Sequence, residues 1–411
     1  MKFNCIIFNL WTSSAVLLLK FRKSMKILAV LCQDPYAWHD GGTFAVRATL
    51  EKLAENAEVC VTGFGEGFNA AYVGPYRSVG SLGRVCNSRI KFLLSLLRGK
   101  SYSVSKYASR EACKKITRIV TEGHYSIIWC EKLVASCPVL CSRAVWQENT
   151  SPKIILRTHN VEYLLVKDRF EHKSAIGRIL VSLECNFLKK YESMIPELVD
   201  QVFCISNEDT HVYRALQSSY AHKVDFLPVT IKPLSLENLS TVADRDFVLF
   251  VGDCEWLPNK KAASWILQDL APLMAKEIPE LRIKLVGRGT NSLQQGVGNV
   301  DLMGFVDSLE SEYAKALCSI APVSIGSGVN IKVIESLAHG VPVVGTRFAK
   351  RGINTAAYGV AETAYEFIEI IKNIRKSADR SVLADIARRE IMKNDQFFDA
   401  VWSRCKNRIK V

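Results

Sequence analysis

The sequence predicts an α/β protein made of two doubly wound, Rossmann-like domains. From residue 25 onward, short apolar and β-branched runs alternate with amphipathic helical runs, which is typical of parallel sheets covered by helices. Turn-forming and polar residues dominate the stretch from Pro228 to Asp246 and divide this pattern in two. The chain has 411 residues, 48% hydrophobic and 23% charged, which is enough for two domains with full cores.

The N-terminal domain is expected over residues 25–228, a linker over 229–246 and the C-terminal domain over 247–394. Strands are predicted at 26–31, 58–62, 126–130, 153–157, 200–204, 224–227, 247–252, 282–286, 318–321 and 342–344. Residues 395–411 are predicted to form a C-terminal helix that crosses back to the N-terminal domain. Ligands of doubly wound sheets bind at the carboxyl ends of the strands, so the cleft between the domains is the expected site.

Residues 1–24 leave two interpretations open. Residues 3–19 are apolar with polar interruptions and are followed by basic residues, so this segment is a short hydrophobic anchor in one interpretation. In the other, Met25 is the natural start, because it leads directly into the first predicted strand. Both interpretations place the rest of the chain in the cytoplasm.

The charge of the chain favours anionic partners. The formal net charge is +13, and between Arg84 and Arg118 there are ten basic residues and a single acid, Glu111. Leucines interleave with these charges, which indicates a basic amphipathic helix lying peripherally on the inner face of the cell membrane. A surface helix with a core face is the alternative. We expect lipid or a phosphorylated substrate, and not nucleic acid, as the anionic partner.

The cysteines and acids do not predict a metal site. The thirteen cysteines include no C-x-x-C pair, so they match neither a zinc ribbon nor a disulfide framework and indicate reduced, structural thiols. Asp244-Arg245-Asp246 imitates a metal-binding D-x-D motif but lies in the linker, where we interpret it as solvated charge. We therefore expect no metal.

The segment 321–344 predicts an anion-binding helix. A strand end, a loop with Gly326 and Gly328, and a helix start would place free backbone N–H groups where a diphosphate can approach closely. One face of the helix carries three polar side chains: Lys332, Glu335 and His339. The lysine suits a phosphate and the carboxylate suits a ribose diol. A solvated face with an i,i+3 ion pair is the alternative that the spacing leaves open.

The run Gly326-x-Gly328-x-x-x-Lys332-x-x-Glu335, followed by Ala338-His339-Gly340-Val341-Pro342, resembles the donor-binding motif of family 4 retaining glycosyltransferases of the GT-B fold. Further similar segments are 250–259, with its Gly, Trp and Pro-Asn, then 285–289, 304–306 and the Gly41-Gly42 loop. The resemblance spans residues 25 to about 405. It implies transfer of a sugar from a nucleotide diphosphate sugar to a hydroxyl acceptor, with retained configuration and without a metal or other cofactor.

By this resemblance, the C-terminal domain binds the nucleotide sugar. Glu335 would hold the ribose, and Lys332 would meet the diphosphate. Ser327 replaces the first acid of the family's E-x7-E motif, so backbone amides near it would meet the sugar or phosphate. The predicted donor-binding residues are Gly326, Ser327, Gly328, Val329, Asn330, Lys332, Glu335, Gly252, Asn259, Lys260, Gly287 and Val306.

In the N-terminal domain, a predicted strand runs into a loop that carries His159. The resemblance implies that His159 is catalytic and contacts the donor sugar, although a histidine at a strand end is more often structural. Gly41 and Gly42 would form the loop that closes near the donor diphosphate and the acceptor.

The expected acceptor is a hydroxyl-bearing glycan or a lipid-linked acceptor in the assembly of a cell-envelope polysaccharide. Two other functions remain open. One is a sugar-nucleotide epimerase of the same fold, and the other is a non-catalytic nucleotide-sugar binding protein, which Ser327 favours. A nicotinamide site is not expected, because the glycines at 63–67 lack the G-x-G-x-x-G spacing.

Overall fold

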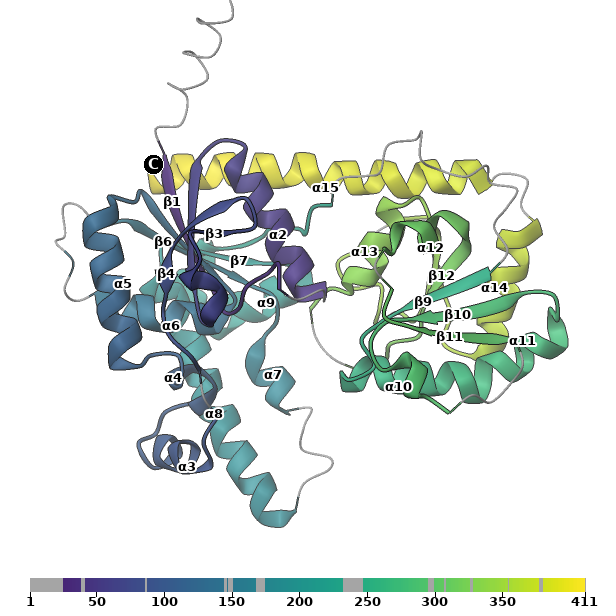
Figure 1. The fold of residues 1–411 in the computed structure, drawn as a ribbon, viewed down its shortest axis with the longest axis horizontal. Coiled ribbons are helices and arrows are strands. Elements are labelled where there is room, and N and C mark those ends of the chain that lie inside the picture. Colours follow the sequence, from purple (N-terminus) through teal and green to yellow (C-terminus); the bar gives the residue numbers. More distant parts are fainter. Residues whose placement is uncertain are drawn as a thin grey trace, which may run out of the picture.

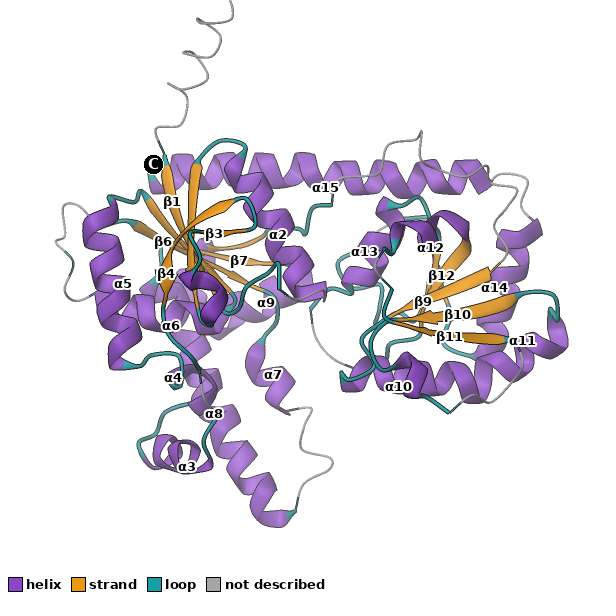
Figure 2. Cartoon of the chain, in the orientation of Figure 1, coloured by secondary structure: helices purple, strands orange, loops and turns teal. Residues whose placement is uncertain are grey.

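The computed structural model contains two parallel sheets, each with helices on both faces (Figures 1 and 2). The structure describes residues 25–37, 41–85, 87–143, 146, 151–167, 174–231, 247–294, 299–306, 308–325, 328–353, 355–376 and 380–410. The predicted α/β architecture with two Rossmann-like domains is therefore confirmed. Residues 1–24 and most of the predicted linker lie outside the described residues.

The N-terminal sheet has eight strands in the order β3-β4-β2-β1-β5-β6-β7-β8, and only the β3–β4 pair is antiparallel. Its strands are β1 (Lys26–Leu31), β2 (Glu58–Gly63), β3 (Tyr72–Val73), β4 (Tyr76–Ser81), β5 (Ile127–Glu131), β6 (Lys153–Thr158), β7 (Gln201–Cys204) and β8 (Val224–Phe226). Its helices are α2 (Gly41–Ala54), α3 (Arg89–Leu97), α4 (Tyr102–Ser105), α5 (Arg110–Gly123), α6 (Leu133–Ser142), α7 (Glu162–Lys167), α8 (Ala175–Leu198) and α9 (Asn207–Leu216).

The C-terminal sheet has six parallel strands in the order β11-β10-β9-β12-β13-β14. Its strands are β9 (Phe247–Val251), β10 (Arg282–Val286), β11 (Val300–Gly304), β12 (Ala316–Ala321), β13 (Val343–Gly345) and β14 (Tyr358–Val360). Its helices are α10 (Leu257–Trp265), which continues through the π-helical turn Ile266–Leu270 into α11 (Ala271–Glu277), then α12 (Glu310–Lys315), α13 (Ile331–Ala338) and α14 (Ala364–Lys376).

Each sheet reverses its strand order once. The reversal lies between β1 and β5 in the N-terminal sheet and between β9 and β12 in the C-terminal sheet. In doubly wound sheets, the loops that leave the carboxyl ends of strands at such a point diverge to opposite faces and leave a crevice for ligands. The described residues among the predicted site residues follow β1, β6, β9, β10, β11 and β12, so they lie on the side of the carboxyl ends of these strands.

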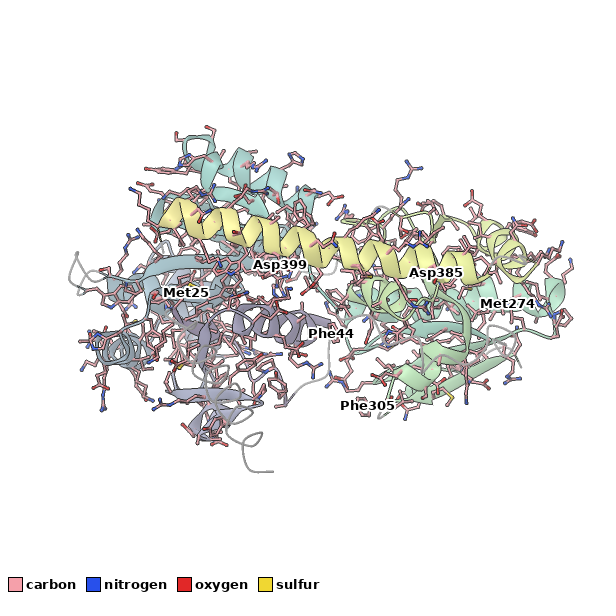
Figure 3. All side chains as sticks on the ribbon, turned by 90° about the horizontal axis from the view of Figure 1, so that it is seen from above. Met25, Phe44, Met274, Phe305, Asp385 and Asp399 are labelled. Atoms are coloured by element: carbon pink, nitrogen blue, oxygen red, sulfur yellow. The ribbon has the colours of Figure 1, made fainter. Side chains whose placement is uncertain are left out.

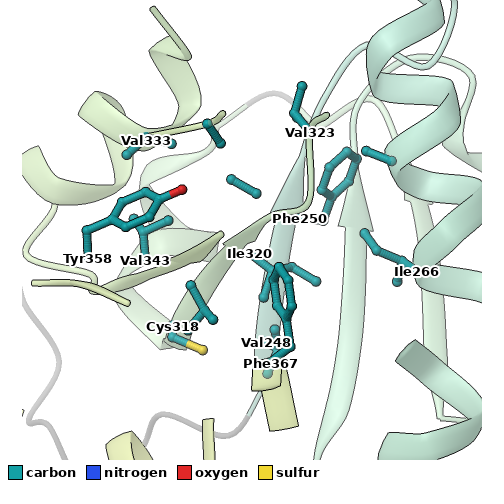
Figure 4. Packing of buried hydrophobic residues seen from close by; sticks show 14 of the residues in the cluster. Val248, Phe250, Ile266, Cys318, Ile320, Val323, Val333, Val343, Tyr358 and Phe367 are labelled. Atoms are coloured by element: carbon teal, nitrogen blue, oxygen red, sulfur yellow. The ribbon is translucent and has the colours of Figure 1, made fainter. Parts of the chain in front are cut away.

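The strands beside these reversal points are apolar because both of their faces are covered. Figure 4 shows Val248 of β9 and Ile320 of β12 beside Phe367 of α14, and Val343 of β13 beside Tyr358 of β14; all five side chains are buried. This burial on both faces explains why the strands form near-continuous hydrophobic runs without polar alternation.

The last helix, α15 (Arg380–Ile409), joins the two domains. Seen from above, it runs along both of them, with Asp385 over the C-terminal domain and Asp399 over the N-terminal domain (Figure 3). The Trp402 ring packs edge-on against Trp129 of β5 at 5.6 Å between centroids. The predicted crossing back is thus present, and the boundary placed at 394/395 falls inside this single helix.

Two expectations for the N-terminal domain need correction. The residues from Arg84 to Arg118 form three helices, α3, α4 and α5, and not one amphipathic helix. The β3–β4 hairpin was missed, because β3 has only two residues and the residues of β4 show no clear alternation of apolar and polar side chains. Among the residues that the structure describes, no helix is both long and apolar enough to span a membrane.

Candidate active site

The carboxyl ends of the two sheets meet through the first turns of two helices, α2 and α13. Gly41 is the first residue of α2, and a Cβ added there would lie 3.0 Å from the Cβ of Ile331, the first residue of α13. Phe44 packs against the C-terminal core, and Figure 3 places it at the junction of the domains. Gly41 and Gly42 therefore start a helix, where a loop was expected. Two positive helix ends converge here, which favours an anion.

The loop before α13 also touches the N-terminal domain. Gly328 has a φ of 75°, and a Cβ there would come within 2.5 Å of the His159 carbonyl oxygen. Only glycine combines this left-handed conformation with so close an approach. Val329 and Asn330 follow, and Asn330 is the residue that precedes the helix. Gly326 and Ser327 lie outside the described residues.

Lys332 is held in a poorly solvated position at the start of α13. Its Nζ donates a hydrogen bond to Asn259 Oδ1 at 2.6 Å and lies 4.5 Å from the centre of the Phe250 ring. Desolvation lowers the pKa of Lys332 to about 7. Because no described carboxylate is paired with Lys332 in an ion pair, an incoming anion would restore its full positive charge.

Glu335 lies one turn further along α13. Burial raises the pKa of Glu335 to about 7, against the opposing effects of a 3.3 Å hydrogen bond from the Tyr313 hydroxyl and of the Arg47 charge. His339 is buried behind these two residues: its ring stacks on Tyr313 at 4.5 Å, and its Nδ1 lies 2.7 Å from the Glu335 carbonyl oxygen. The expected three-residue polar face is thus reduced to Lys332 and Glu335.

The other predicted donor-binding residues occupy neighbouring strand ends. Asn259 is buried and donates to the Asp253 carbonyl oxygen at 3.0 Å while accepting from Lys332, so it positions the lysine. Gly252 and Gly287 directly follow β9 and β10, and Val306 lies two residues after Gly304, which ends β11. Lys260 is exposed on α10.

His159 belongs to a buried polar network at the ends of β5 and β6. Its Nε2 lies 2.7 Å from Glu131 Oε1, which also accepts from Arg157 Nη1 at 2.8 Å. Trp129 Nε1 donates to Glu131 Oε2 at 2.5 Å. Burial alone would raise the pKa of Glu131, but Arg157 and the hydrogen bond from His159 outweigh it and hold this pKa below its usual value.

This network defines the state of the histidine. Burial lowers the pKa of His159, more than its hydrogen bond to Glu131 raises it, so the ring is neutral at pH 7. An ionised carboxylate only accepts hydrogen bonds, so the proton resides on Nε2. Nδ1 is then the acceptor atom of the ring.

Three residues at this junction escaped the sequence analysis. Glu131 ends β5, and its only signal in the sequence is that it directly follows an apolar run. Lys132 follows it with φ 73° and ψ 150°, a region that is almost restricted to glycine and costs about 1–3 kcal/mol, and such strain concentrates at functional sites. Arg47 lies on α2, and its charge reaches Glu335 across the domain junction.

Within the described ranges, no group of three or more His, Cys, Asp or Glu side chains is arranged to hold a metal ion. Asp244 and Asp246 are outside those ranges.

Comparison with known proteins shows which proteins this arrangement resembles. Residues 245–375 match the family model described as Glycosyl transferases group 1. The solved structures that resemble the chain have the GT-B fold, in which two Rossmann-like domains face each other. The chain therefore has this fold and carries a segment of group 1 glycosyltransferase type.

Three particular proteins illustrate the likeness. The chain is 22% identical over 348 residues to a Klebsiella pneumoniae protein described as an uncharacterized 44.6 kDa protein in the cps region, covering 80% of this chain and 85% of that protein. Anabaena HepE in complex with UDP and glucose superposes with a TM-score of 0.61 and 14% identity, over 92% of this chain and 99% of that chain. Sucrose-phosphate synthase from Thermosynechococcus elongatus superposes with a TM-score of 0.61 and 15% identity, over 92% of this chain and 100% of that chain.

The buried Glu131 network leads to a stability prediction. We expect Glu131→Gln to lower the free energy of unfolding by about 3 kcal/mol, because it leaves the buried Arg157 guanidinium without its counter-charge. Since the folded-state pKa of Glu131 is depressed, this stabilisation is present above the unfolded-state pKa and is lost as the pH falls through the folded value. The difference between wild type and variant should therefore shrink in acid.

Denaturant titrations at pH 7 and in acid measure this difference. Glu66→Gln is the matched control, because Glu66 pairs with Arg84 on the surface, where an ion pair contributes about 0–1 kcal/mol. Equal losses for the two variants would show that Glu131 does not balance a buried charge.

Proposed function

We propose that this protein is a glycosyltransferase that moves a sugar from a nucleotide diphosphate sugar to a hydroxyl acceptor, with retention of configuration. The observation that carries the proposal is the convergence of α2 and α13 beside Lys332, Glu335 and His159. The match of 245–375 to group 1 glycosyltransferases supports it independently.

The C-terminal half of the site suits the nucleotide. A diphosphate at the start of α13 would meet backbone N–H groups, the positive helix end and the Lys332 ammonium. Glu335, once ionised, offers two oxygens to a ribose diol. Anabaena HepE binds UDP and glucose on the same fold, which supports a uridine diphosphate sugar as the donor here.

The N-terminal half suits the sugar and the reaction. In the transfer, the bond from the anomeric carbon to the diphosphate oxygen breaks, a bond to the acceptor oxygen forms, and the acceptor loses its hydroxyl proton. Charge develops on the leaving diphosphate, where Lys332 and the helix end stabilise it without a metal. His159 accepts a hydrogen bond from a sugar hydroxyl at Nδ1, because Glu131 engages its other nitrogen.

The acceptor that we propose is a glycan or lipid-linked glycan of the cell envelope, assembled on the cytoplasmic side. The relative described as a protein in the cps region supports a role in polysaccharide assembly. A sugar-nucleotide epimerase and a non-catalytic binding protein use the same donor site, so product analysis has to separate the three functions.

The proposal is tested by ligand binding followed by product analysis. In a thermal-shift panel of nucleotide diphosphates and their sugars, a true donor at 100 times its dissociation constant adds about 2.7 kcal/mol to stability. With the best donor and glycan or lipid acceptors, transfer yields free nucleotide diphosphate and a lengthened acceptor. An isomerised nucleotide sugar would indicate an epimerase instead, and binding without either product would indicate a binding protein.

His159→Ala is expected to retain donor binding within about twofold and to lower kcat by two orders of magnitude or more, because it removes a group at the reaction centre. Turnover and equilibrium binding are measured on the same preparation. His339→Ala serves as the comparison, since His339 is buried beside Tyr313. Wild-type turnover in His159→Ala would reduce this histidine to a structural residue.

Lys332→Ala is expected to weaken binding of a nucleotide diphosphate sugar by about 10- to 100-fold, the range of a charge-assisted hydrogen bond, and binding of the nucleoside by less than twofold. The pKa of Lys332 is about 7 in the empty site, so the ratio of nucleotide-sugar to nucleoside affinity should fall as the pH rises above 7, where the lysine loses its proton. Ionisation of Glu335 in the same pH range acts on the ribose and therefore affects both ligands. The variant should lose the dependence of this ratio on pH.

Calorimetry with a nucleotide sugar and its nucleoside across pH 6–9 measures both the loss of affinity in the variant and the dependence of affinity on pH. Lys260→Ala is the matched control, because Lys260 is an exposed lysine on the neighbouring helix. An equal loss for nucleotide sugar and nucleoside would contradict the assignment of Lys332 to the diphosphate.

A further inference from the structure

Two neighbouring helices of the N-terminal domain expose apolar faces. On α3, the residues at positions i, i+3, i+4 and i+7 are exposed, and Leu97 reaches 84% exposure. On α8, a second stripe begins with Ile176 at 73% exposure. The residues of this surface, which we call the α3–α8 patch, are Ile90, Leu93, Leu94, Leu97, Ile176, Ile179 and Leu183. Monomeric soluble proteins rarely leave large apolar patches uncovered.

The exposure is a property of the folded helices and not of loose packing. Leu96 on the opposite side of α3 is buried, and Phe92 packs edge-on against Tyr102 at 5.7 Å. α3 thus already uses its inner face to attach to the domain. Figures 1 and 2 show α3 and the first turns of α8 at the end of the N-terminal domain that lies farthest from α15.

Basic side chains surround this apolar surface. Arg89 and Lys91 are exposed on α3, Arg98 and Lys100 are exposed immediately after it, and Arg178 is exposed on α8. The sequence from Gly67 to Arg110 contains no acidic residue. An apolar stripe bordered by cations is the pattern of a helix that lies in the interface of an anionic bilayer.

The acids of α8 do not counter this charge, because the two in its middle are turned inward. Glu184 Oε1 accepts from the Ser101 hydroxyl at 2.7 Å and from Ser103 N at 2.9 Å. Glu192 accepts from the backbone N–H groups of residues 162 and 163, both at 2.9 Å. The remaining acid, Glu197, stands at the other end of the helix.

From this arrangement we propose that the α3–α8 patch docks the protein on the surface of an anionic membrane. The apolar side chains enter the interface, and the surrounding cations meet lipid phosphates. This inference goes beyond the proposed function, because it concerns a surface that contains none of the donor-site residues. It also replaces the expected helix over 84–118: α5 buries Ala112, Ile116 and Val120 and behaves as an ordinary surface helix.

A second copy of the chain fits the patch less well than a bilayer does. Two patches facing each other would bring the same cations together with no exposed described acid on α3 or the first half of α8, where Glu184 is buried. An anionic lipid surface supplies the opposite charge. Charge complementarity therefore selects the membrane.

The test is flotation of the full chain with vesicles of phosphatidylcholine alone or with about one third phosphatidylglycerol, at low and high salt. The wild-type protein should float with the anionic vesicles at low salt and be released at high salt. I90S/L94S/L97S should abolish flotation. R89Q/K91Q/R98Q should lower partitioning about a hundredfold, since each basic residue near an anionic surface contributes roughly fivefold.

Matched controls separate the patch from general charge and from the N-terminal segment. K276Q/K315Q/K376Q removes the same charge from exposed positions of the C-terminal domain and should bind vesicles as the wild type does. Unchanged binding of both patch variants would overturn the proposal and point to another surface, including residues 1–24. A second outcome would also overturn the proposal: the wild type does not bind vesicles, and its molecular mass in solution is higher than that of I90S/L94S/L97S. The patch would then contact a second copy of the chain. Circular dichroism verifies folding, and none of these readouts requires a donor or an acceptor.

Discussion

Helix α15 packs into the cores of both domains, and the geometry of the candidate active site depends on this contact. Phe398 and Trp402 belong to the core that includes β1 and β5, whereas Ala387 and Ile391 belong to the C-terminal core. Between these two groups, Lys52 of α2 forms 3.1 Å ion pairs with Asp395 and Asp399. One helix thus fixes α2 to the C-terminal domain and holds its first turn against α13.

Burial tunes the two halves of the site in opposite ways. Lys332 and Glu335 are desolvated without a compensating ion pair, so the pKa of each is shifted to about 7 and their charges respond to a ligand. Glu131 is more deeply buried but keeps its charge, because Arg157 and His159 both contact it. One half is electrostatically adaptable, and the other holds a histidine in a single protonation state.

The α3–α8 patch and the candidate site around His159 are connected through short segments of chain. His159 is followed within a few residues by α7, and Glu192 of α8 accepts hydrogen bonds from the first two residues of α7. The helix that presents part of the patch therefore also anchors the segment that carries the histidine. Docking would orient the acceptor side of the molecule, since every element of the patch belongs to the N-terminal domain.

Much of the fold followed from local sequence patterns. Buried parallel strands such as β1, β6, β9 and β10 are continuous apolar runs, and their predicted limits agree with the structure to within a residue because both faces of each strand are covered. The stop of α13 was also predictable, since Gly340 adopts a φ of 66° at its end. The roles of Lys332, Glu335 and His159 remain predictions from resemblance.

What the sequence by itself determined is the alternation of strands and helices, the division into two domains, and the strand ends at which a ligand is expected. Only the tertiary structure brought Glu131 to His159, 28 residues away, placed His339 against Tyr313, and exposed the leucines of α3. Hydrophobic periodicity reports which face of a helix is apolar, but not whether another element covers it. Contacts between separate strand ends depend on the order of strands in the sheet, which long-range packing decides.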